Sequence, residues 1–176
     1  KNEKESLPKV LDELKGFNFR KNVILEASDK LTIQAIKTYD CKIIYQDSHG
    51  YGDALKKGIE TIETEFFCIF NADGSFNPRE LKSMLKILRF KNNDFVFASR
   101  YIKDGGSDDD DIVTFVGNKC FSFIGNILFQ LNLSDILYTY IIGKTLSAKN
   151  LNLTYSDFRI CVEIPIKAKF NRYESI

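Results

Sequence analysis

The sequence predicts a single α/β domain, spanning residues 1–176, with a mostly parallel sheet and helices on both of its faces. Short apolar runs alternate along the chain with segments whose apolar residues recur at helical spacing. The run Phe-Phe-Cys-Ile-Phe at residues 66–70 contains no polar side chain, which is typical of a strand in the middle of a parallel sheet. A chain of 176 residues, 44% of them hydrophobic, is long enough to bury such a core.

The part of the chain before this strand predicts three helices and two strands. A polar residue that can cap a helix, apolar residues at helical spacing and a glycine that ends them predict a helix over residues 7–15. Short apolar runs predict strands at residues 23–25 and 42–45. Helices follow both strands, with apolar residues at Leu31, Ile33 and Ile36 in one and at Ala54, Leu55, Ile59 and Ile62 in the other.

The part of the chain after residues 66–70 begins with a well-marked helix. Asn77 and Glu80 occupy the first and fourth positions of a capping box, and Pro78 lies in the first helical turn. An apolar stripe follows at Leu81, Met84, Leu85 and Leu88. Residues 94–99 contain the apolar run Phe-Val-Phe-Ala and predict another strand.

The last third of the chain predicts one long helix and two shorter elements. Residues 112–133 are apolar but carry polar side chains at intervals, which favours an amphipathic or buried helix over one that spans a membrane. Before them, Asp108–Asp111 follow two glycines, and we expect a solvated, self-repelling stretch there rather than a metal site. Weaker patterns predict a strand at residues 138–142 and a helix at residues 163–170.

Charge and cysteine content restrict the partners and the compartment. Lysine plus arginine total 25 against 24 acidic residues, and the net charge of +1 gives no reason to expect a nucleic-acid partner. The four cysteines are far apart and form no CxxC pair, which indicates reduced thiols. The chain does not open with the basic and then apolar pattern of a signal peptide, so we expect a cytoplasmic protein.

Polar side chains follow four predicted strands at their carboxyl ends, where ligands bind in open α/β sheets. They are Glu26 with Asp29, the His49 loop with Gly50 and Gly52, Asn71 with Asp73, and Arg100. A carboxylate such as Asp73 can hold a divalent cation that in turn holds a diphosphate, or it can simply cap a helix. Arg100 can clamp a phosphate or pair with a surface carboxylate.

Several motifs, in order and spacing, resemble those of the inverting glycosyltransferases of family 2. They are Asn2-Glu3, the loop of residues 50–58, the turn Asn71-Ala72-Asp73-Gly74-Ser75 with Pro78, Ser99-Arg100-Tyr101 with Gly105-Gly106, and Asp135. The likeness covers nearly all of the chain. The subgroup that it resembles is the polyprenyl-phosphate sugar transferases, similar to dolichol-phosphate mannosyltransferase.

The resemblance implies a GT-A fold, a GDP- or UDP-hexose donor and a Mg²⁺ or Mn²⁺ ion held by a DXD-like turn. It implies metal contacts from Asn71, Asp73 and Ser75, donor contacts from Glu3, Glu26, Asp29, Gly50, Gly52, Asn71 and Ala72, and catalytic roles for Asp73, Arg100 and Asp135. Arg100 matches a residue that meets the acceptor phosphate, and Asp135 matches one near the acceptor or the sugar. Asn71 stands where the family's first acidic residue is expected, which removes one charge from the metal site.

The acceptor implied by the resemblance is a polyprenyl phosphate or a saccharide. A phosphate is already a nucleophilic anion, whereas a sugar hydroxyl would need a base such as Asp135. A non-catalytic nucleotide-sugar-binding domain and a related sugar nucleotidyltransferase are the alternatives. The resemblance also places the family's first strand before Asn2-Glu3 and its last strand after Ile176. Residues 112–133 favour peripheral contact with the cytoplasmic surface of a membrane.

Overall fold

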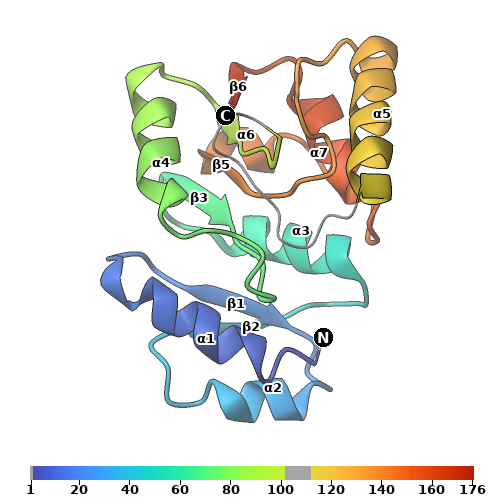
Figure 1. The fold of residues 1–176 in the computed structure, drawn as a ribbon. Helices are drawn as coiled ribbons and strands as arrows, with labels where there is room; N and C mark the ends of the chain where they lie inside the picture. The colour runs from blue at the N-terminus through green and yellow to red at the C-terminus, as the bar shows by residue number, and fades with distance from the viewer. Residues whose placement is uncertain (1, 102–111) are drawn as a thin grey trace.

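The protein is an α/β domain with two sheets, seen in a computed structural model that describes residues 2–101 and 112–176 (Figure 1). The Gly105-Gly106 motif and Asp108–Asp111 lie outside the described residues. The elements are, in order, α1 (Ser6–Glu13), a 3₁₀ turn (Leu14–Gly16), β1 (Asn22–Leu25), α2 (Lys30–Ala35), β2 (Lys42–Tyr45), α3 (Tyr51–Thr61), β3 (Phe66–Ile69), α4 (Glu80–Phe90), β4 (Phe95–Phe97), α5 (Ile112–Phe129), β5 (Ile141–Lys144), α6 (Thr145–Lys149), α7 (Ile160–Ala168) and β6 (Tyr173–Ser175).

The larger sheet contains four strands in the order β3-β5-β4-β6, and β1 pairs with β2 in a separate parallel pair. Strand β5 runs antiparallel to both β3 and β4, whereas β6 runs parallel to β4. Three of the four strands therefore point the same way. The α/β class is confirmed, but β3 lies at an edge of the four-stranded sheet and not in its middle.

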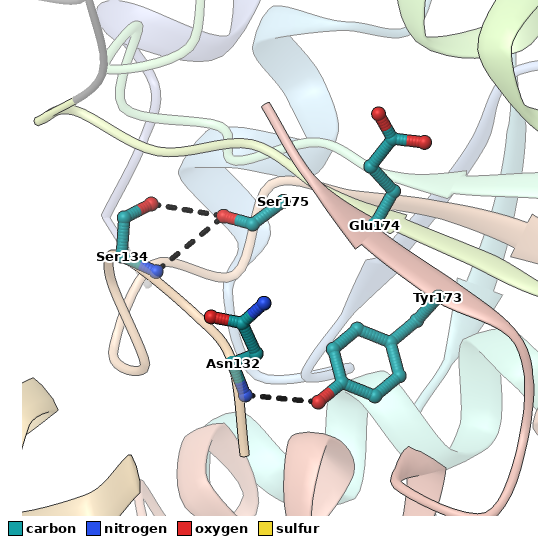
Figure 2. Close-up of a pocket in the computed structure, with 5 residues that line it drawn as sticks. All are labelled: Asn132, Ser134, Tyr173, Glu174 and Ser175. Carbon is teal, nitrogen blue, oxygen red and sulfur yellow. Dashed lines mark hydrogen bonds between the residues drawn. The ribbon is translucent and has the colours of Figure 1, made fainter.

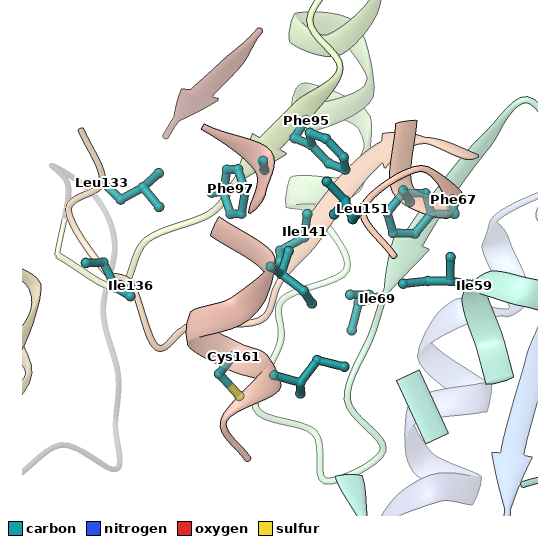
Figure 3. Packing of buried hydrophobic residues seen from close by; sticks show 14 of the residues in the cluster. Ile59, Phe67, Ile69, Phe95, Phe97, Leu133, Ile136, Ile141, Leu151 and Cys161 are labelled. Carbon is teal, nitrogen blue, oxygen red and sulfur yellow. The ribbon is translucent and has the colours of Figure 1, made fainter. Parts of the chain in front are cut away.

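Helices cover both faces of the larger sheet, as the sequence predicts. Along β3, Phe67 and Ile69 pack into one core, while Phe66 and Cys68 pack against the other, because neighbouring side chains of a strand point to opposite faces. The first core includes apolar residues of α3 and α7, and Figure 3 shows part of it. The second core is closed by the apolar stripe of α4. The apolar sequence of β3 is thus explained by the two cores that cover its faces, and it does not require a strand on each side of β3.

Several elements differ from their predicted positions. Helix α5 ends at Phe129 and not at residue 133, and the short helix α6 was not predicted. Helix α4 begins at Glu80, because Asn77 uses its side chain to accept a hydrogen bond from the backbone N–H of Arg79, at 3.0 Å, in a turn that precedes the helix. Helix α7 begins at Ile160, three residues earlier than predicted, and β5 begins at Ile141, three residues later. Strand β6 was not predicted, since Tyr173–Ser175 carries no strand pattern and is formed by pairing with β4.

Helix α5 is a single helix of 18 residues that carries many exposed apolar side chains. Among them, Phe123 is 67% exposed and Ile127 is 63% exposed. Among the described residues, no helix is both long and apolar enough to cross a membrane. Helix α5 is thus not buried, and its outward side is an uncovered apolar surface.

Candidate active site

The turn that follows β3 presents Asp73 to solvent. Its Oδ1 accepts a hydrogen bond from the backbone N–H of Ser75 at 2.9 Å, and Gly74 between them has a φ of 86°. A positive φ of this size favours glycine, so the sequence Asp-Gly-Ser suits the turn. Ala72, one residue earlier, packs against the apolar cluster of α1, β1 and α2. The turn therefore joins the two sheets and carries an exposed carboxylate.

Asn71, at the start of this turn, is hydrogen-bonded to Tyr51, which in turn is hydrogen-bonded to Thr139. The Tyr51 hydroxyl lies 3.0 Å from Asn71 Oδ1, to which it donates, and 2.7 Å from Thr139 Oγ1. The ring of Tyr51 stacks on Phe158, with their centroids 5.2 Å apart. Burial raises the pKa of Tyr51 to about 12, so its hydroxyl remains a donor at neutral pH. Sequence reasoning gave Tyr51 no role, although its place between two glycines was visible.

Gly50 and Gly52 permit close contact with another part of the chain. A Cβ on Gly52 would lie 2.6 Å from the carbonyl oxygen of Tyr155, and Gly50 has a φ of 105°. The backbone N–H of Asp53 donates to the carbonyl of Ser156 at 3.1 Å. The segment of residues 155–157 thus packs on the start of α3, and this contact requires both glycines. Their role in donor binding stays a prediction.

Glu163 fixes that segment from inside the protein. Its carboxylate accepts hydrogen bonds from the backbone N–H groups of Thr154 and Tyr155, at 2.8 and 3.0 Å, and from the Thr154 hydroxyl at 2.6 Å. Lys167 Nζ lies 2.8 Å away. Burial raises the pKa of Glu163, but Lys167 and the Thr154 and Tyr155 donors outweigh it and lower the pKa to about 2. Sequence analysis did not single out Glu163.

The predicted donor-binding carboxylates lie around the two-stranded sheet. Asp29 is buried and caps α2, accepting from the backbone N–H of Thr32 at 3.3 Å and of Asn2 at 2.9 Å. Burial raises the pKa of Asp29, yet these hydrogen bonds bring it below its usual value. Glu26 lies 3.4 Å from Nδ1 of His49, and Glu3 accepts a hydrogen bond from the Ser6 hydroxyl. Contact of these carboxylates with a nucleotide stays a prediction.

Arg100 and Asp135, predicted separately, form one ion pair. The Arg100 Nε and an Nη atom lie 2.8 and 3.2 Å from the two oxygens of Asp135. Asp135 is only 2% exposed. The guanidinium also lies 5.1 Å from the ring centroids of both Tyr101 and Tyr138, within cation–π distance. Both Asp135 oxygens are therefore engaged, and Arg100 is held in one orientation.

Helix α5 adds a second cation beside Arg100 that sequence analysis missed. Lys119 Nζ lies 4.8 Å from the centroid of the Tyr101 ring, and Asn118 donates to the Tyr101 hydroxyl at 2.8 Å. Tyr101 thus lies between the Arg100 and Lys119 side chains. The only signal in the sequence was a single lysine in an otherwise uncharged apolar helix.

The donor atoms of the turn suit a metal ion that is shared with a phosphate ligand. Within residues 2–101 and 112–176, no group of three or more His, Cys, Asp or Glu side chains could hold a metal ion. The turn supplies the carboxylate of Asp73 and the amide oxygen of Asn71. Mg²⁺ is commonly held by one or two carboxylates together with substrate phosphates, so this donor set fits a metal that binds with a diphosphate.

A cavity of about 490 Å³ lies at the edge of the larger sheet, away from this turn. Asn132, Ser134, Tyr173, Glu174 and Ser175 line it (Figure 2). Inside it, Ser134 Oγ and Ser175 Oγ are 2.9 Å apart, and the backbone N–H of Asn132 donates to the Tyr173 hydroxyl. None of the predicted site residues lines it.

The order and directions of the strands and the helices on both faces of the larger sheet correspond to the GT-A fold. The family model of glycosyl transferase family 2 matches residues 1–162, so the chain belongs to that family. The predicted family and fold are thereby confirmed.

Solved structures of the same fold include two sugar phosphoglycerate synthases. The chain is similar to mannosyl-3-phosphoglycerate synthase from Rubrobacter xylanophilus, with 15% identity and a TM-score of 0.72, over 99% of this chain and 62% of that one. It is also similar to glucosyl-3-phosphoglycerate synthase from Mycobacterium tuberculosis in complex with Mn²⁺, UDP and glucosyl-3-phosphoglycerate, with 11% identity and a TM-score of 0.74, over 99% and 66%. The chain thus spans less than two thirds of the length of the Rubrobacter enzyme.

Proposed function

We propose that the protein transfers a hexose, with inversion, from a GDP- or UDP-hexose to an acceptor that carries a phosphate. The observation that carries this proposal is the turn of residues 71–75, which follows a buried strand of a family 2 chain and exposes the carboxylate of Asp73. Solved structures of similar fold contain UDP-glucose with Mn²⁺, which supports a nucleotide-sugar donor.

The divalent cation, Mg²⁺ or Mn²⁺, would be held by Asp73 and the amide oxygen of Asn71, with the Ser75 hydroxyl as a further candidate. When bound, such a cation offsets the negative charge that develops on the leaving diphosphate. Because the turn of residues 71–75 offers a single carboxylate, we expect the cation to bind mainly together with the donor. Asp73 sets the affinity for the cation, and the Ser75 N–H orients Asp73.

The acceptor that we favour is a polyprenyl phosphate. Arg100 and Lys119 both contact the ring of Tyr101, and Lys119 offers a positive charge for the phosphate, while Asp135 balances the charge of Arg100. The apolar side chains that α5 exposes, Phe123 and Ile127 among them, are suited to a lipid chain or to the membrane that contains it. Both Asp135 oxygens contact Arg100, so Asp135 is not well placed to deprotonate a sugar hydroxyl. A phosphate nucleophile needs no such base.

A thermal-shift panel of GDP- and UDP-sugars, with and without Mn²⁺, tests the donor and the metal. Ligand stabilisation follows occupancy, so a donor should raise the melting temperature of wild type more with Mn²⁺ than without it. Asp73→Ala should lose this metal-dependent increment, while the control Asp47→Ala, an exposed carboxylate paired with Lys57, should keep it. A metal-dependent shift that persists in Asp73→Ala would show that Asp73 does not hold the cation.

An assay of hydrolysis and transfer, with Mn²⁺ and the donor added, separates transfer from simple binding. Asn71 leaves one carboxylate where two are expected, which favours a non-catalytic nucleotide-sugar-binding domain as the second candidate. Binding of donor with Mn²⁺, without hydrolysis or transfer to a polyprenyl phosphate in the full-length protein, would support that candidate. A nucleotidyltransferase would instead join a nucleoside triphosphate to a sugar phosphate and release pyrophosphate from the triphosphate.

We further propose that α5 contacts the cytoplasmic surface of a membrane. Flotation with vesicles that contain anionic lipid should carry wild type, and the double variant Phe123→Asp/Ile127→Asp should lose most of this binding because two charges enter the apolar surface. The control is Phe90→Asp on α4, where Phe90 is 86% exposed. Equal flotation of all three proteins would place the membrane contact elsewhere or exclude it.

A further inference from the structure

Tyr51 contacts three segments that are distant in sequence. It is the first residue of α3, and its ring stacks on Phe158 from the segment before α7. Its hydroxyl meets Asn71, in the turn after β3, and Thr139, just before β5. The Gly50 and Gly52 contacts with residues 155–157 fix the backbone on either side of the ring. These contacts together fix the position of the Tyr51 hydroxyl.

The side chain of Asn71 accepts the hydrogen bond that the Tyr51 hydroxyl donates. Asn71 Oδ1 is the atom with which an asparagine would coordinate a cation, and an amide on a freely rotating side chain would present Oδ1 or Nδ2 with little preference. A hydrogen bond from Tyr51 at 3.0 Å selects the amide orientation. A carbonyl oxygen has two lone pairs, so Oδ1 can accept from Tyr51 and still contact a cation.

We infer that Tyr51 is a positioning residue that, supported by Thr139, orients the amide of Asn71 and so sets the cation and diphosphate affinity of the turn. This inference rests on the proposed function, because it needs a cation-dependent nucleotide at the turn. Outer hydrogen bonds commonly orient the groups that bind a metal, and their loss weakens metal binding without removing a ligand. At the position where a carboxylate is expected from the family resemblance, this chain has the amide of Asn71, and Tyr51 fixes the orientation of that amide.

Tyr51→Phe is the direct test, since it removes the hydroxyl and keeps the ring that stacks on Phe158. Titration of Mn²⁺ into protein with UDP, and in parallel with GDP, is followed by calorimetry and by melting temperature. We expect the half-saturating Mn²⁺ concentration with the preferred nucleotide to rise roughly fivefold, which corresponds to the loss of one neutral hydrogen bond. Nucleotide binding without metal should change much less.

Two further variants separate positioning from general destabilisation. Thr139→Val removes the other partner of the hydroxyl and should shift Mn²⁺ affinity in the same direction as Tyr51→Phe. In an Asn71→Ala background, Tyr51→Phe should have no further effect on Mn²⁺ affinity, because the group through which it acts is gone. Tyr39→Phe, which loses a hydrogen bond to Asp12 outside the site, is the control.

The outcomes distinguish this inference from the proposed function. If wild type binds a nucleotide in a Mn²⁺-dependent way and Tyr51→Phe binds it equally well, the positioning role is wrong and the proposed function stands. Equal effects of Tyr51→Phe in the wild-type and Asn71→Ala backgrounds would likewise exclude action through Asn71. If wild type shows no Mn²⁺-dependent nucleotide binding, both the function and the inference are overturned.

Discussion

Replacing Asp135 by asparagine is expected to lower the free energy of unfolding by about 2–3 kcal/mol, because it leaves the partly buried Arg100 cation without a counter-charge. Asp135 is among the most buried side chains of the protein, and both of its oxygens contact Arg100. Chemical denaturation at neutral pH measures the loss. Asp157→Asn, at an exposed pair with Arg159 of the same two-point geometry, is the control and should change stability little.

The same substitution also tests what Asp135 does in the reaction. If Asp135 serves to orient Arg100, Asp135→Asn should raise the KM for a phosphate acceptor and leave the pH dependence of turnover unchanged. A double variant, Asp135→Asn/Arg100→Gln, should lose less stability than the sum of the two single variants, because the two residues interact directly. Loss of the acidic limb of the pH profile, with stability intact, would instead identify Asp135 as a general base.

Glu163→Gln is expected to cost about 3 kcal/mol of stability at neutral pH. The folded protein lowers the pKa of Glu163 from 4.5 to about 2, and a depressed pKa of this size corresponds to about 3 kcal/mol by linkage. A lowered pKa stabilises the folded state fully above pH 4.5, and this contribution is lost as the pH falls from 4.5 toward 2. The stability difference between wild type and Glu163→Gln should therefore shrink over this range.

Urea denaturation of both proteins between pH 2 and pH 7 measures this difference. Glu60→Gln is the control, since Glu60 is exposed and lies 3.9 Å from Lys57 in a long ion pair. A difference that stays constant with pH would contradict the assignment of the effect to the charge of Glu163. Since Glu163 holds Thr154 and Tyr155, the variant should also loosen the segment that packs on Gly50 and Gly52.

The spacing of apolar residues along the sequence predicted the strands and helices whose burial follows that spacing. The apolar runs at β2, β3 and β4 and the stripe of α4 were placed correctly, because burial on one or both faces leaves a visible periodicity. The sequence of strand β6 shows no such periodicity. Its short sequence, Tyr-Glu-Ser, becomes a strand through pairing with β4, where Phe95 is opposite Tyr173 and Phe97 is opposite Ser175.

The candidate site was predicted as a set of residues but not as a set of pairs. The turn of residues 71–75 lies where the end of a strand was expected to place it. In contrast, the ion pair of Arg100 with Asp135 and the contact of Tyr51 with Asn71 join residues 35 and 20 positions apart. No periodicity records such contacts, because they depend on how the sheet and its connecting segments fold together.

The edge position of β3 has a consequence for solution behaviour. Among the described residues, β3 is hydrogen-bonded to β5 on one side only, although both of its faces are buried. Backbone groups on its other side are left without a strand partner within the described chain, and such an edge can accept another extended segment. Amide hydrogen exchange in the chain as described should therefore be faster in β3 than in β5, which is paired on both sides.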